Sequence, residues 1–167
     1  MKQVAVIGLG QFGRAAAEAL AAHCEVLAMD RQEEKVDAIK DAVTQAVSLD
    51  VTDRTTLEHF LKSSIDCVII SLGDDLESAV LATLYAREIG VERIIVKSNS
   101  PDHSKILSLV GATQVVFPEE AQAKRLARTL IKPNLLDYVP LTEGYSISEV
   151  AAPASFEGKT LKELDLR

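Results

Sequence analysis

The sequence predicts an α/β fold built on a parallel, doubly wound sheet of six strands. Between Val4 and Phe117, short apolar runs alternate with stretches of helical length, which is the pattern of successive βαβ units. Several of these runs are apolar at consecutive positions, as in VAVI at 4–7 and CVII at 67–70. Strands of this composition are buried on both faces, as they are in a parallel sheet covered by helices.

The predicted strands and helices follow one another in strict order. Strands are expected for the two apolar runs that open and close the stretch Val4–Asp30, and then at Gln45–Leu49, Asp66–Ser71, Arg93–Lys97 and Gln114–Phe117. Helices are expected in the alanine-rich part of the first stretch, at Gln32–Lys40, after a cap at Thr52 or Asp53, at Leu76–Ile89 and at Pro101–Val110. A glycine directly follows each of the last two helices, as is usual at a helix C-terminus.

The pattern changes after Pro118. Glu119–Ile131 is predicted to be a helix with alanines and leucines along one stripe, and Pro133 ends it. Leu135–Leu141 is apolar with one charge, so we expect it to pack against another surface, for which a second subunit is one candidate. The remainder is predicted, in order, as a strand from Tyr145, a turn at Phe156–Lys159 and the start of a helix at Thr160–Arg167.

Composition excludes several classes of protein. The net charge of −7 and pI near 5.0 argue against a nucleic-acid surface, which needs clustered Lys and Arg. We find neither an apolar span of membrane length nor a signal peptide, and therefore expect a soluble, cytoplasmic protein. Cys24 and Cys67 are expected to be buried thiols, and neither they nor the three histidines have the spacing of a metal site.

The turn after the first strand contains Gly8, Gly10 and Gly13, with Gln11 and Phe12 before the last of these. Each glycine has a physical role. Gly8 can adopt the backbone angles of a tight turn, Gly10 has no side chain to keep a pyrophosphate away, and Gly13 lets the helix pack closely. The helix N-terminus that follows offers amide N–H groups and a positive dipole end to phosphates. We therefore predict a nucleotide diphosphate site at this turn.

Asp30 ends the second strand about twenty residues after the glycines, where it can accept hydrogen bonds from a ribose diol. A carboxylate at this position favours a free 2′-hydroxyl and repels the 2′-phosphate of NADP. Arg31 could accommodate a phosphate, although a solvated arginine at a helix start is the simpler interpretation. The order of strand, glycines, helix, strand and acid makes this prediction more specific than the glycine spacing alone.

Further candidates follow the ends of later strands. Asp50 and Val51 stand where an adenine would lie, with a plain turn as the alternative. Leu72 and Gly73 are candidate binding residues in the loop after the fourth strand. Asp74 and Asp75, which follow, are expected first of all to cap a helix, and the alternative is that they bound the distal end of the nucleotide, with Gly73 allowing close approach. Lys97 could complement phosphates or pair with an acid.

Taken together, these motifs resemble the RCK (KTN, TrkA-N) domain, a cytosolic nucleotide-binding regulator of prokaryotic potassium channels and Trk/Ktr potassium transporters. The resemblance is carried by VIGLGQFG at 6–13, Asp30, SLDVTD at 48–53, VIISLGDD at 68–75, VKSNS at 96–100, VVFPEE at 115–120, LLDYVPL at 135–141 and ISEVAAPASFEGKTLKEL at 147–164. It implies a Rossmann-like RCK-N domain at 1–133, a crossover or hinge with a dimer contact at 134–144, and an incomplete RCK-C domain from 145 to 167.

The resemblance also implies partners. Members dimerise through the region matching 121–139, and dimers assemble into an octameric ring beneath a membrane potassium pore. Nucleotide exchange would change the shape of the ring and so gate the pore, without catalysis. We would then expect this chain at the inner face of the cell membrane, held there by a pore subunit.

Two positions bear on the ligand that the resemblance implies. In Ktr-type members that bind ATP an arginine commonly follows GLG, whereas Gln11 stands there in this chain, as in Trk-type members associated with NAD. We therefore expect NAD(H), with ADP and ATP as alternatives. Glu119 matches a family acid beside the nucleotide that in some members helps to hold a cation, although a glutamate in a first helical turn can simply interact with the helix dipole.

Two other functions compete with a regulatory subunit. An NAD-dependent oxidoreductase would explain the glycine turn, but the chain shows no substrate domain and no obvious proton donor. A nucleotide-sensing module unrelated to potassium transport would share the same site.

Overall fold

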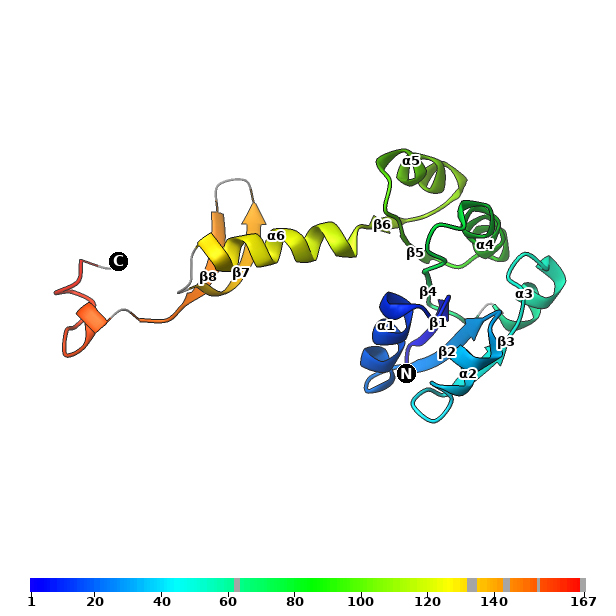
Figure 1. Cartoon of the computed structure of the whole chain (residues 1–167), viewed down its shortest axis with the longest axis horizontal. Helices are drawn as coiled ribbons and strands as arrows, with labels where there is room; N and C mark the ends of the chain where they lie inside the picture. The colour runs from blue at the N-terminus through cyan, green and yellow to red at the C-terminus, as the bar shows by residue number, and fades with distance from the viewer. Residues whose placement is uncertain (62–63, 132–134, 143–144, 153, 166–167) are drawn as a thin grey trace. The chain divides into compact units, whose positions relative to one another are not determined.

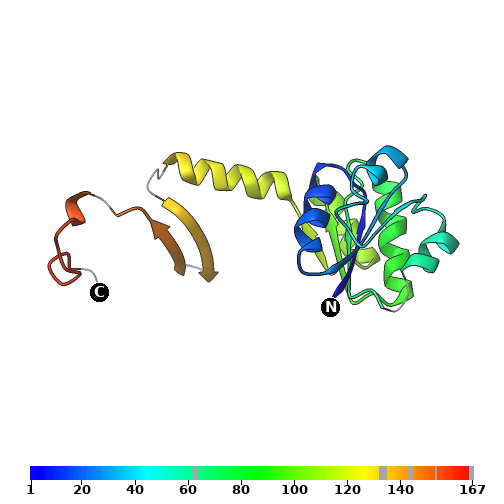
Figure 2. The same cartoon turned by 90° about the horizontal axis from the view of Figure 1, so that it is seen from below.

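The computed structural model describes residues 1–61, 64–131, 135–142, 145–152 and 154–165. The chain divides into two compact units, Met1–Pro118 and Glu119–Arg167, which we describe separately (Figures 1 and 2). The first unit contains the glycine turn and every predicted site residue except Glu119.

A six-stranded parallel sheet forms the centre of the first unit, in the order β3-β2-β1-β4-β5-β6. This confirms the predicted doubly wound, Rossmann-like sheet. The strands are β1 (Gln3–Ile7), β2 (Glu25–Asp30), β3 (Gln45–Ser48), β4 (Cys67–Ile70), β5 (Arg93–Lys97) and β6 (Gln114–Val116).

Helices connect these strands: α1 (Gln11–Ala21), α2 (Glu33–Asp37), α3 (Arg54–Phe60), α4 (Leu76–Ile89) and α5 (Pro101–Val110). Asp53, and not Thr52, caps α3, because its side chain accepts the Thr55 and Thr56 N–H groups at 3.1 and 3.4 Å. Helix α2 is shorter than predicted. It ends at Asp37, and turns and bends occupy the residues between it and β3.

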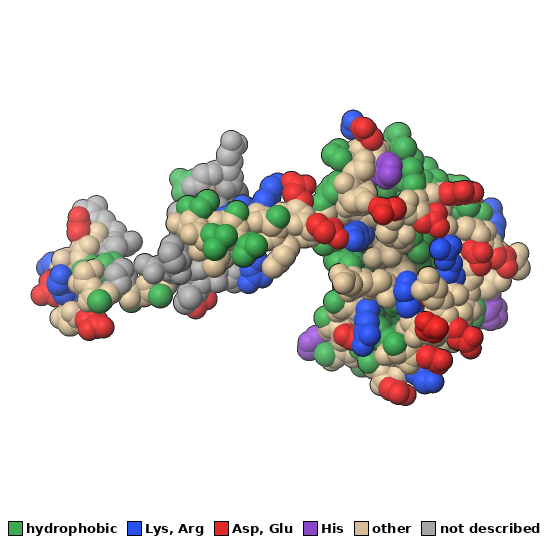
Figure 3. Space-filling model, in the orientation of Figure 1, with side chains coloured by type: hydrophobic (Ala, Val, Ile, Leu, Met, Phe, Trp, Pro, Cys, Tyr) green, Lys and Arg blue, Asp and Glu red, His purple; other side chains and the backbone are tan. Residues whose placement is uncertain are grey.

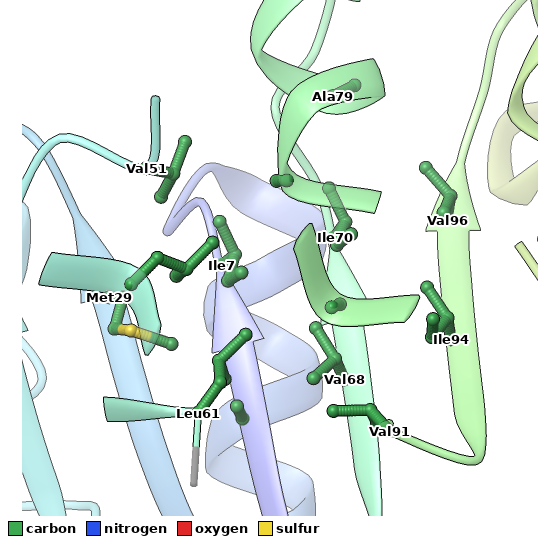
Figure 4. Close-up of a cluster of buried hydrophobic side chains, with 14 of the residues drawn as sticks. Ile7, Met29, Val51, Leu61, Val68, Ile70, Ala79, Val91, Ile94 and Val96 are labelled. Atoms are coloured by element: carbon green, nitrogen blue, oxygen red, sulfur yellow. The ribbon is translucent and has the colours of Figure 1, made fainter. Parts of the chain in front are cut away.

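Two apolar layers cover the sheet. On one face, Ile7, Met29 and Val68 of the strands pack with side chains of α3, α4 and α5 (Figure 4). On the other face, Val6 and Ala28 pack with side chains of α1 and α2. Successive residues of the central strands are therefore buried on opposite sides, which explains why their sequences are apolar at consecutive positions.

Helix α6 (Pro118–Ile131) starts at the last residue of the first unit and otherwise belongs to the second. It is followed by β7 (Leu135–Thr142), β8 (Tyr145–Val150) and a 3₁₀ turn at Ala154–Phe156. The predicted helix is confirmed, but β7 was not predicted as a strand; it pairs antiparallel with β8. The helix expected from Thr160 is wrong for the described residues 160–165, since 161–165 form turns and no helix. Pro133 lies outside the described residues.

None of the described helices combines the length and the apolar character needed to cross a membrane.

Candidate functional site

The glycine turn lies where the direction of the sheet reverses. From β1 the chain builds outward through β2 to β3, then crosses to β4 on the other side of β1. Helix α1 packs on one face of the sheet and α4 on the opposite face. The loops after β1 and β4 therefore diverge, which is the arrangement at which doubly wound sheets bind their ligands.

Gly8 and Gly13 are required by the backbone itself. Gly8 has φ +87°, and a Cβ there would lie 2.7 Å from the Ser71 carbonyl carbon. A Cβ on Gly13 would lie 3.0 Å from the Gly8 carbonyl carbon and overlap its oxygen. Only glycine fits both positions, because carbonyl groups of the backbone cannot move aside as flexible side chains do.

Gly10 differs from these two glycines, because a Cβ there would meet nothing within 4 Å. It is the N-cap of α1, and its carbonyl accepts the Arg14 N–H at 2.9 Å. Gln11 and Phe12 form the first turn of α1, whose N–H groups have no acceptor inside the helix. The lack of a side chain at Gly10 thus leaves open space beside amides that suit an anion.

Asp30 is buried beside this turn and bonds two backbone segments. Its Oδ2 accepts the Leu9 N–H at 2.7 Å, and its Oδ1 accepts the Gln32 N–H at 2.9 Å. Lys35 Nζ lies 3.6 Å from Oδ2. The sequence predicted the acid but neither Leu9 nor Lys35 as its partners, because the direction of an amide inside a turn cannot be recognised from residue types.

Arg31 is exposed and contacts the loop after β4. One of its guanidinium nitrogens, Nη1, lies 3.9 Å from Asp75 Oδ2. Asp75 caps α4 by accepting the Ser78 N–H at 3.1 Å and the Ser78 hydroxyl at 2.8 Å. Both bonds lower the pKa of Asp75, and the bond from the Ser78 N–H has the larger effect. The positive charge of Arg31 lowers this pKa further. The capping role expected for this aspartate is therefore present.

Asp50 and Val51 follow β3. Asp50 Oδ1 accepts the Thr52 N–H at 2.9 Å and the Thr52 hydroxyl at 2.7 Å, and these bonds lower the pKa of Asp50. The Val51 side chain is buried in the same core as Met29. A base at this position would therefore meet the backbone of Val51 and not its side chain.

Leu72 and Gly73 follow β4, next to β1. A Cβ placed on Gly8 would lie 3.1 Å from the Leu72 side chain, so Leu72 borders the glycine turn. Gly73 has φ +66° and nothing within 4 Å of a Cβ. The structure thus brings Leu72 close to the first glycine of the turn.

Lys97 and Glu119 belong to other elements than the glycine turn. Lys97 ends β5, which β4 separates from β1. Glu119 is the second residue of α6 and belongs to the second unit. Their contacts with a nucleotide stay predictions. In the part of the chain that the structure describes, no three His, Cys, Asp or Glu side chains are grouped to hold a metal ion.

Comparison with known proteins gives one consistent family. The TrkA-N domain family matches residues 4–118. Ktr system potassium uptake protein C of Bacillus subtilis is 40% identical over 167 residues, which cover 99% of this chain and 76% of that protein.

Solved structures extend the comparison. The NAD(P)-binding domain of an exopolyphosphatase-related protein from Archaeoglobus fulgidus aligns with a TM-score of 0.68 and 27% identity, over 79% of this chain and 99% of that one. GsuK bound to ADP aligns with a TM-score of 0.64 and 27% identity, over 77% of this chain and 34% of that one. With the family match over most of the sheet and the close similarity to a Ktr protein, the chain belongs to the TrkA-N (RCK) family.

Proposed function

We propose that this chain is a regulatory subunit of a potassium uptake system that binds an adenine nucleotide without turning it over. The observation that carries the proposal is the open space at Gly10, beside a buried Asp30 at the reversal point of the sheet. Similarity to the Ktr potassium uptake protein of B. subtilis supports the role in potassium transport.

NAD(H) is the proposed ligand, with ADP and ATP as alternatives. Asp30 favours a ribose with a free 2′-hydroxyl over the 2′-phosphate of NADP. The NAD(P)-binding domain and the ADP-bound GsuK structure, each 27% identical, support this class of ligand. The proposed binding residues are Gly8, Gly10, Gln11, Phe12, Gly13, Asp30, Arg31, Asp50, Val51, Leu72, Gly73, Lys97 and Glu119.

The acids around the turn support binding without catalysis. Asp30, Asp50 and Asp75 each accept a backbone N–H group. The hydrogen bonds of Asp50 and Asp75 lower the pKa of these two carboxyl groups, so both are poorly suited to donate a proton to a carbonyl. Both oxygens of Asp30 are already used to hold backbone N–H groups of the two loops.

Assembly would turn nucleotide binding into regulation. Leu126, Leu130 and Ile131 of α6 are exposed by 59%, 74% and 77%, and Figure 3 shows hydrophobic side chains on the surface of this helix. This supports a dimer contact through α6. Such dimers, joined in an octameric ring on a membrane pore, would respond to a nucleotide that binds one ring shape more tightly than another. The ratio of the ligand's affinities for the two shapes sets the largest change that it can make in the equilibrium constant between them.

A thermal-shift panel with NAD, NADH, NADP, ADP and ATP tests the nucleotide site. At least one of the four ligands whose adenosine ribose has a free diol should raise the melting temperature, because a ligand that binds only the folded state stabilises it. NADP should have a smaller effect than NAD. The absence of any shift would contradict the proposal, and sustained consumption of NADH with carbonyl substrates would instead indicate an oxidoreductase.

A further inference from the structure

One buried side chain connects two segments that flank the proposed ligand. Leu9 lies inside the glycine turn, and Gln32 lies in the turn between β2 and α2. Asp30 accepts the N–H groups of both, at 2.7 and 2.9 Å. The position of the loop proposed to bind the diphosphate is therefore fixed relative to the strand end proposed to bind the ribose.

We propose that Asp30 is a positioning residue for the glycine turn, and that it controls the affinity for any adenine nucleotide, including one without a ribose diol. This rests on the proposed nucleotide-binding function and adds a second role to the ribose contact. Leu9 and Asp30 are exposed by only 4% and 6%, so removal of the carboxylate leaves the Leu9 N–H without an acceptor in a largely buried position. A carboxylate oxygen accepts more than one hydrogen bond, so Asp30 can hold the turn and a ribose hydroxyl together.

Electrostatics alone predicts the opposite effect. A negative charge beside a phosphate loop weakens the binding of anions, although Lys35 at 3.6 Å offsets part of it. If the carboxylate acted only through its charge, a neutral residue at position 30 would strengthen the binding of a ligand without the diol. If it acts by holding Leu9, the same change weakens that binding. The two roles therefore differ in the sign of the effect.

Titration calorimetry of the whole chain with ADP and with 2′,3′-dideoxy-ADP separates these roles. Asp30→Ala should bind the dideoxy compound about tenfold more weakly than the wild type, as expected when a buried N–H loses its acceptor. Asp30→Asn keeps one oxygen that can accept the Leu9 N–H, although its amide nitrogen cannot accept the Gln32 N–H, and it also removes the negative charge. It should therefore bind the dideoxy compound at least as tightly as the wild type does. Asp37→Ala is the matched control, because it removes an exposed carboxylate of α2 that bonds Lys40 and not the turn.

Unchanged or tighter binding of dideoxy-ADP by Asp30→Ala would overturn the proposal, and so would an equal loss in Asp30→Asn. Hydrogen exchange at the Leu9 amide of the ligand-free wild type tests the contact without any variant. Slow exchange supports the contact, whereas exchange as fast as that of an exposed amide overturns it. A wild type that binds no adenine nucleotide would contradict the proposed function, whereas fast exchange at Leu9 together with normal binding would contradict only this inference.

Discussion

The Cα of Gly13 faces the carbonyl group of Gly8 so closely that a Cβ on Gly13 would lie 3.0 Å from the carbonyl carbon and overlap the oxygen. This contact brings the first turn of α1 against the end of β1. Both partners are backbone atoms, so neither can rotate away. The close packing of α1 on β1 therefore depends on the path of the backbone through the glycine turn, and neither can change without the other.

Gly13→Ala should destabilise the fold. The added methyl group must push α1 away from β1, and overpacking of this kind typically costs about 1–3 kcal/mol. Urea denaturation should show a lower free energy of unfolding by about that amount. A variant as stable as the wild type would mean that the helix shifts without cost, and that the glycine is not required for packing.

Gly10→Ala should instead affect the ligand. Its Cβ meets nothing within 4 Å, and φ −66° with ψ −175° is allowed for alanine. The free energy of unfolding should fall by less than about 1 kcal/mol, chiefly because alanine is a poorer N-cap than glycine. The affinity for adenine nucleotides should fall at least about tenfold, because the methyl group would occupy the space left for the diphosphate. Calorimetry and urea denaturation of the same preparation distinguish the two effects.

The sequence predicted those features of the site that depend on local geometry. Gly8 and Gly13 have the roles assigned to them, and Asp30 ends β2 beside their turn. The use of both Asp30 oxygens by Leu9 and Gln32 could not be predicted, because it depends on the orientation of two amides after folding. Strand β7 was missed for a related reason: a short apolar segment containing Pro140 becomes a strand only through pairing with β8, and strand propensity depends strongly on such context.

Asp75 should make stability depend on pH. Its folded-state pKa lies below the ordinary value of 3.8 because it accepts hydrogen bonds from Ser78. A lowered pKa stabilises the fold above the unfolded-state value, and this contribution disappears as the pH falls through the folded-state value. Asp75→Asn keeps a capping oxygen without a titrating charge. Its free energy of unfolding should be below that of the wild type at pH about 7, and the difference should shrink toward pH about 3.

Asp75→Ala controls for the cap itself. It removes the acceptor of the Ser78 N–H, and loss of a helix N-cap costs about 1 kcal/mol. Urea denaturation at both pH values should therefore place it below the Asn variant. A difference between wild type and Asp75→Asn that stayed constant with pH would show that the carboxylate charge contributes nothing at this cap.

The exposed leucines of α6 should govern association and not the stability of the sheet. Each residue from Glu119 to Ile131 is exposed in the chain taken alone, while Ala123, Leu126, Ala127 and Leu130 recur at the spacing of one helical face. The combined variant Leu126→Ser and Leu130→Ser removes the two largest side chains of this stripe. Light scattering after gel filtration should show a smaller assembly than for the wild type.

Arg125→Ser is the matched control, because position 125 lies on the side of α6 away from the stripe. It should assemble as the wild type does. The melting temperature of the nucleotide-binding unit should be the same in both variants when it is measured at a concentration where the wild type is monomeric. If the serine pair assembled normally, the apolar stripe would not be the contact, and a dimer would have to form through another surface. If both variants dissociated, the contact would extend beyond the apolar stripe to the charged side of the helix, and the stripe alone would not define it.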